Sequence, residues 1–82
     1  MKVLVVDYDK LARIGLISIM DWGKYGFEVV GDVQNGRKAL EFLKDNVVEI
    51  VFTDIDMPEI DGIELMKRCK KEYPDVKFVV FS

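Results

Sequence analysis

The chain has 82 residues, of which 50% are hydrophobic, and its formal net charge is −3. This length allows one small domain, the mild negative charge argues against direct binding of nucleic acid, and no apolar stretch approaches the ~20 residues of a membrane-spanning helix. Histidine is absent, which excludes histidine-based catalysis and the usual zinc sites. The single cysteine, Cys69, excludes an internal disulfide, so we expect a protein of the reducing cytoplasm.

Short apolar runs alternate with amphipathic stretches, and this pattern predicts alternating strands and helices. In chain order, we expect a strand at residues 2–6, a helix at 10–20, a strand at 27–33, a helix at 37–44, a strand at 47–53, a helix at 63–72 and a strand at 76–81. Asp61 is the expected N-cap of the third helix. We expect the aromatic residues Trp22, Tyr25 and Phe27 to pack the first helix onto the sheet.

Acidic residues follow the ends of the first and third expected strands. Asp7 and Asp9 follow the first strand, and Asp54 and Asp56 follow the third. Strands joined by helices are parallel, and sites in open α/β sheets lie outside the carboxyl ends of the strands. The acids should therefore meet at one edge of the sheet, where clustered carboxylates attract a divalent cation or a positively charged group. A carboxylate beside a bound metal can act as a nucleophile toward phosphorus.

Four segments of the chain carry a family pattern, namely residues 3–7, 35–40, 53–62 and 79–82. Together they resemble the receiver domain of two-component response regulators, and the stretch from Asp54 to Gly62 is the most specific part. Residues 13–16 and 21–31 also resemble a subgroup whose receivers precede an AraC-type DNA-binding domain. The resemblance implies a flavodoxin-like α/β fold, an open parallel sheet with strand order 2-1-3-4.

The resemblance also implies a role for each acidic residue. Asp54 matches the phosphoacceptor, which takes a phosphoryl group from a sensor histidine kinase. Asp7 matches the first member of the family's acidic pair, and Asp9 aligns with a common third acid. We therefore expect Mg²⁺ to contact Asp7, Asp9, Asp54 and the backbone carbonyl of Asp56, because magnesium prefers oxygen ligands and neutralises charge during phosphoryl transfer.

The remaining site residues implied by the resemblance lie in a loop and at the end of the fourth strand. Met57 and Pro58 shape the loop that carries Asp56 past the metal, and Ser82 matches the hydroxyl that swings toward the phosphoryl group. The expected function is a switch in a phosphorelay rather than a turnover enzyme. The expected partners are a histidine kinase and the chain's own output domain, which acts on transcription if it binds DNA.

Two departures from the family pattern change these expectations. Tyr8 occupies the position of the second consecutive acid, so we expect weakened magnesium binding. The sequence stops at Ser82, before the family's fifth strand, its phosphate-pairing lysine and its last two helices. We accordingly expect residues 1–82 to form a single partial receiver with impaired switching, either excised from a longer chain or self-associating through the edge of the fourth strand.

Two alternative functions remain open at this point. A degenerate receiver could serve only as a protein-interaction module, and Tyr8 together with the missing lysine motivates this interpretation. A phosphatase of the haloacid-dehalogenase type also begins with an aspartate pair after an apolar strand, as Asp54 and Asp56 do. Met57-Pro58 replaces the small polar turn expected in that class, which disfavours the second alternative.

Overall fold

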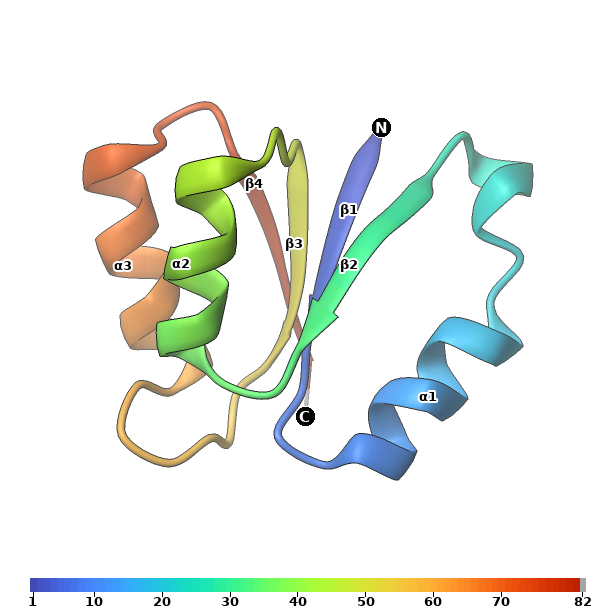
Figure 1. Cartoon of the computed structure of the whole chain (residues 1–82), viewed down its shortest axis with the longest axis horizontal. Coiled ribbons are helices and arrows are strands. Elements are labelled where there is room, and N and C mark those ends of the chain that lie inside the picture. The colour runs from blue at the N-terminus through green and yellow to red at the C-terminus, as the bar shows by residue number, and fades with distance from the viewer. Residues whose placement is uncertain (82) are drawn as a thin grey trace.

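Four parallel strands form one sheet in the part of the chain that the structure describes, residues 1–81, and helices cover both faces (Figure 1). In this computed structural model the elements are β1 (Lys2–Val6), α1 (Lys10–Ile19), the 3-10 helix η1 (Trp22–Tyr25), β2 (Glu28–Val33), α2 (Gly36–Asp45), β3 (Ile50–Asp54), α3 (Gly62–Glu72) and β4 (Lys77–Phe81). The predicted alternation of strands and helices is therefore confirmed.

The strand order is β2-β1-β3-β4, with every pair parallel, as the α/β class and the order 2-1-3-4 predicted. Val6 of β1 lies beside Val33 of β2 and Thr53 of β3. Asp54, the last residue of β3, lies beside Phe81 of β4. This register places the carboxyl ends of β1 and β3 next to each other at one edge of the sheet.

The larger part of the core lies between the sheet and the pair α2 and α3 (Figure 1). The apolar spacing of each helix turns one stripe toward the strands, and the residues buried there include Ala39, Leu43, Leu65 and Cys69. They pack against Leu4, Val6 and Val51 of the two central strands, among others. Burial of this kind supplies most of the stabilisation of a small domain.

The opposite face of the sheet carries α1 and η1 over a smaller core. Trp22 is buried and meets Phe52 edge to face, with ring centroids 5.2 Å apart, and Phe27 lies 6.0 Å from Phe52. The packing role predicted for Trp22 and Phe27 is confirmed. The same prediction for Tyr25 is wrong, because its side chain is 62% exposed at the end of η1.

Two expected boundaries shift by more than two residues or change type. β3 begins at Ile50 rather than at residue 47, because the pairing with β1 starts at Val3 and Ile50, and Val47 remains exposed before the sheet. Residues 22–25, which lie between the expected helix at 10–20 and the expected strand at 27–33, form η1, and the side chain of Asp21 accepts a hydrogen bond from the amide of Lys24.

Candidate functional site

Asp7 leaves the end of β1 as a buried acid held from several sides. Asp7 is only 5% exposed, and its backbone amide donates to the carbonyl of Val33 at 3.1 Å. Its carboxylate oxygen Oδ1 accepts the backbone amide of Asp9 at 2.9 Å. A burial this deep requires such partners, because an unpaired buried carboxylate is costly.

Asp9, the second acid after β1, caps a helix. It is the N-cap of α1, and its Oδ1 accepts from the amides of Leu11 at 2.9 Å and Ala12 at 3.3 Å. These contacts satisfy two amides that the first turn of a helix leaves without a partner. The metal contact predicted for Asp9 must therefore share the carboxylate with this capping role.

Asp54 ends β3 directly beside the end of β1. It follows Thr53, which pairs with Val6, just as Asp7 follows Val6, so Asp7 and Asp54 leave neighbouring strands at the same end. Asp54 is half-buried, and its Oδ1 accepts the amide of Asp56 at 3.2 Å. The juxtaposition of Asp7 and Asp54 expected from the sequence is present.

The loop after Asp54 is folded back tightly against the end of its own strand. Met57 is buried in the core beneath α2 and α3, whereas Pro58 and Asp56 are exposed. Glu59 has a positive φ of 67°, a left-handed conformation that costs a non-glycine residue free energy. Asp61 caps α3 by accepting from the amide of Glu64 at 2.8 Å, which confirms its predicted role.

Gly62 makes the closest backbone approach in this loop. Its amide donates to the carbonyl of Ile55 at 3.1 Å. A Cβ atom at position 62 would overlap the carbonyl oxygen of Asp54 and lie 3.0 Å from the Cα of Ile55. Only glycine fits at this position, so a larger residue would displace either the start of α3 or the backbone of Asp54 and Ile55.

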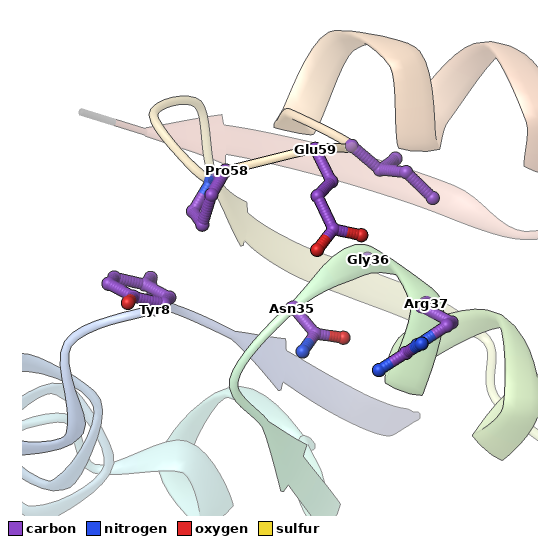
Figure 2. A pocket seen from close by; sticks show the side chains of 7 residues that line it. Tyr8, Asn35, Gly36, Arg37, Pro58 and Glu59 are labelled. Atoms are coloured by element: carbon purple, nitrogen blue, oxygen red, sulfur yellow. The ribbon is translucent and has the colours of Figure 1, made fainter.

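A cavity of about 260 Å³ lies beside the acidic edge, between the turns that follow β1, β2 and β3. Its lining residues are Tyr8, Asn35, Gly36, Arg37, Pro58, Glu59 and Ile60. Figure 2 shows the carboxylate of Glu59 directed toward the start of α2, with Tyr8 and Pro58 at the opposite side. Tyr8 is 58% exposed, so the neutral phenol stands at the surface of the site.

Arg13 also lies at this edge, although no motif of the sequence marks it as a site residue. Its guanidinium donates to the backbone carbonyl of Asp7 at 2.7 Å and to Oδ1 of Asp32 at 2.8 Å. The available signal was its position one helical turn after the N-cap of α1, close to the acids in sequence. That Asp32 of β2 would be its partner depends on strand pairing, which the local sequence does not encode.

Outside this edge, Cys69 is the one group among the described residues with a resolved change in acidity. Burial, with a smaller contribution from the charge of Glu72, raises the pKa of the Cys69 thiol to about 11. The thiol therefore stays protonated and unreactive near neutral pH. This agrees with a helix-face residue of the core rather than a functional group.

The donor set at the acidic edge consists of carboxylate and carbonyl oxygens. Within residues 1–81, no group of three or more histidine, cysteine, aspartate or glutamate side chains is close enough to hold a metal by itself. Asp7 and Asp54 are the two acidic residues that the strand register places side by side, and Ser82, the predicted switch hydroxyl, lies outside the described residues. None of the helices described is long and apolar enough to cross a membrane.

Residues 3–82 match the family model of the response regulator receiver domain. The chain is 41% identical over 81 residues to the chemotaxis protein CheY of Thermotoga maritima, covering 99% of this chain and 66% of CheY. It is 36% identical over 81 residues to the uncharacterized transcriptional regulatory protein YesN of Bacillus subtilis, covering 99% of this chain and 22% of YesN. The chain thus spans less than two thirds of the length of these relatives.

Two solved structures share this arrangement of strands and helices. The two component transcriptional regulator AraC from Clostridium phytofermentans superposes with a TM-score of 0.89 and 32% identity, covering 98% of this chain and 64% of that chain. The receiver domain of AraT, a response regulator from Geobacillus stearothermophilus, superposes with a TM-score of 0.86 and 34% identity, covering 96% of this chain and 61% of that chain.

Proposed function

The chain belongs to the response regulator receiver domain family, and on that basis we propose that it is the phosphoacceptor receiver of a two-component system, with Asp54 as the acceptor. The observation that carries this proposal is the half-buried Asp54 carboxylate at the end of β3, next to Asp7 at the end of β1. Family membership leaves the haloacid-dehalogenase alternative without support.

The proposed chemistry is a single phosphoryl transfer. An oxygen of Asp54 attacks the phosphorus of a phosphohistidine, the donor's N–P bond breaks, an acyl phosphate forms on Asp54, and the released imidazole takes a proton. The amide of Asp56 donates to Oδ1 of Asp54, which orients the carboxylate and leaves Oδ2 as the proposed nucleophile. The result is a modified switch protein and not a turnover enzyme.

Magnesium fits the donor set of this edge. Asp7 and Asp54 supply carboxylates, the backbone of Asp56 supplies a carbonyl, and Mg²⁺ is commonly bound by one or two carboxylates together with waters and phosphate oxygens. When bound, the ion neutralises charge on the transferred phosphoryl group. Asp9 stays a proposed additional contact, and the neutral Tyr8 at the second acidic position accounts for the weakened binding that we propose.

The proposed partners follow from the family and its relatives. A sensor histidine kinase donates the phosphoryl group in the cytoplasm, and an output domain of the same protein responds to it, with Ser82 as the switch hydroxyl. YesN and the AraC neighbour are transcriptional regulators, so we propose transcription as the output. Val79 on the edge strand β4 is 39% exposed. We propose that the chain self-associates through this edge. Light scattering that shows a monomer at high concentration would contradict this self-association.

Phosphorylation by a small donor tests the proposal directly. Incubation with acetyl phosphate and Mg²⁺ should add one phosphoryl group, detected by intact mass, and the substitution Asp54→Asn should abolish the addition. Asp75→Asn is the matched control, because Asp75 is an exposed acid in the turn between α3 and β4. An unmodified wild-type chain, or equal modification of Asp54→Asn, would refute the proposal.

A degenerate receiver that acts only as an interaction module is the second candidate. Two observations favour it, namely the exposed phenol of Tyr8 at the acidic position and the use of the Asp9 carboxylate as a helix cap. Titration with Mg²⁺ followed by NMR separates the two functions. An unchanged spectrum together with no phosphorylation would support the interaction module.

A further inference from the structure

Arg13 connects three elements at the acidic edge. Its side chain is only 11% exposed, its Nη1 donates to the backbone carbonyl of Asp7 at 2.7 Å, and its Nε donates to Oδ1 of Asp32 at 2.8 Å. We infer that Arg13 is a positioning residue of the site, which holds the Asp7 carboxylate in place by tying the end of β1 to α1 and β2. This inference rests on the proposed function for its consequence, and its structural part is testable without it.

The planar geometry of the Arg13 guanidinium restricts where its two acceptors can lie. A guanidinium presents its N–H donors in a rigid planar fork, so two acceptors at different nitrogens are held at a fixed separation. The backbone of Asp32 is fixed by the pairing of β2 with β1, where it lies beside Val5, and its side chain is 44% exposed. The guanidinium of Arg13 therefore fixes the carbonyl of Asp7 relative to β2.

The two peptide groups that flank the Cα of Asp7 are both anchored. The amide of Asp7 donates to Val33, and its carbonyl accepts from Arg13. With both peptide planes fixed, the direction of the Cα–Cβ bond is fixed as well, and the amide of Asp9 then holds Oδ1 of the carboxylate. Loss of Arg13 frees the peptide between Asp7 and Tyr8 to rotate.

The position of the Asp7 carboxylate matters because the two residues that follow it offer little replacement as metal ligands. Position 8 is a tyrosine, and Oδ1 of Asp9 is engaged in the cap of α1. Groups that orient a metal-binding side chain without touching the metal affect metal affinity by about tenfold or more. Arg13 is placed to have such an effect through Asp7.

The chain offers a matched control in a second arginine with a carboxylate partner. Arg68 donates through Nε to Glu64 at 3.3 Å within α3, and both side chains are about half exposed, at 52% and 49%. Exposed pairs of this kind contribute little to stability. Arg68→Met therefore removes the same chemical group from a place remote from the acidic edge.

The test measures amide exchange and Mg²⁺ affinity by NMR in the chain itself and in Arg13→Met, Arg13→Lys and Arg68→Met. In Arg13→Met we expect the Asp9 amide to exchange about tenfold faster, while the amide of Val5 in β1 keeps its protection. We expect Mg²⁺ affinity to fall about tenfold, with a smaller loss in Arg13→Lys, whose single ammonium cannot span both acceptors in the same geometry. Arg68→Met should match the wild type in both measurements.

Three results would overturn the inference. The first is an unchanged exchange rate of the Asp9 amide in Arg13→Met. The second is equal acceleration of exchange at Asp9 and Val5, which would mean that Arg13 supports the fold in general. The third is wild-type amide exchange and Mg²⁺ affinity in Arg13→Lys. A wild-type chain that does not respond to Mg²⁺ would refute the proposed function instead. The exchange comparison would still decide whether Arg13 positions Asp7.

Discussion

The two faces of the sheet hold their helices by different means. α2 and α3 bury apolar side chains, such as Leu65 and Cys69, that are fully removed from solvent. No residue of α1 is fully buried: Leu16 and Ile17 are partly buried against the smaller core, and Leu11 is 79% exposed. The start of α1 is fixed instead by polar contacts of Asp9 and Arg13. The α2 and α3 face therefore holds the more extensive core, while polar contacts hold the acidic turn on the other face.

Truncation of one leucine on each face of the sheet should show the difference between the two faces most strongly. Leu65→Ala leaves a cavity in the core between α3 and the sheet, so we expect a loss of about 2–5 kcal/mol in the free energy of unfolding. Leu11→Ala removes an exposed side chain and should change the same quantity by less than about 0.5 kcal/mol. Urea unfolding measures both. Similar losses in the two variants would show that α1 is packed as tightly as α3.

Glycine-to-alanine substitutions test how closely the backbones of α3 and α1 approach their surroundings. Gly62→Ala forces a Cβ against the backbone of Asp54 and Ile55, so we expect a loss of about 1–3 kcal/mol. Gly15→Ala lies in the interior of α1 with no heavy atom within 4 Å of the new Cβ, and we expect a gain of about 0.5–1 kcal/mol.

Thermal unfolding measures these changes, and NMR adds a local readout. The amides of residues 54–56 should shift in Gly62→Ala and not in Gly15→Ala. Unchanged shifts in Gly62→Ala would mean that α3 moves away as a unit and that the backbone of Asp54 does not depend on the residue at position 62.

A smaller loss than in Leu65→Ala or Gly62→Ala is expected at the cap of α1. Asp9→Ala leaves the amides of Leu11 and Ala12 without their acceptor, which should cost about 1 kcal/mol. Asp9→Asn keeps a side-chain oxygen for the cap and should retain wild-type stability within a few tenths of a kcal/mol. Equal losses in both variants would contradict the capping role. A lower Mg²⁺ affinity in Asp9→Asn at unchanged stability would support the metal contact predicted for this residue.

Much of the fold was accessible from local sequence patterns. Runs of β-branched residues and helical apolar spacing located every strand and the three α-helices found within residues 1–81, since each pattern expresses which face of an element is buried. Asp61 was identifiable as a cap because capping needs only a short polar side chain before a helix. Val47 and Tyr25 were misplaced, because an apolar or aromatic residue near a strand does not by itself show whether the sheet extends to it.

The candidate site divides in the same way. The motif from Asp54 to Gly62 could be recognised because its residues are contiguous. The roles of Asp54, Asp7 and Asp56 at a metal stay predictions, as does that of Ser82. The part played by Arg13 could not be foreseen, because its two acceptors belong to segments 6 and 19 residues away in the chain.

The order of strands and helices and the presence of acids at strand ends were determined by the sequence alone, because both depend on residue type and local spacing. The tertiary structure decided which neighbours those acids have. Strand pairing set Asp7 beside Asp54, close packing required Gly62 at the start of α3, and the approach of β2 to α1 gave Arg13 its partner. These contacts join residues distant in the chain, and their geometry exists only once the sheet has formed.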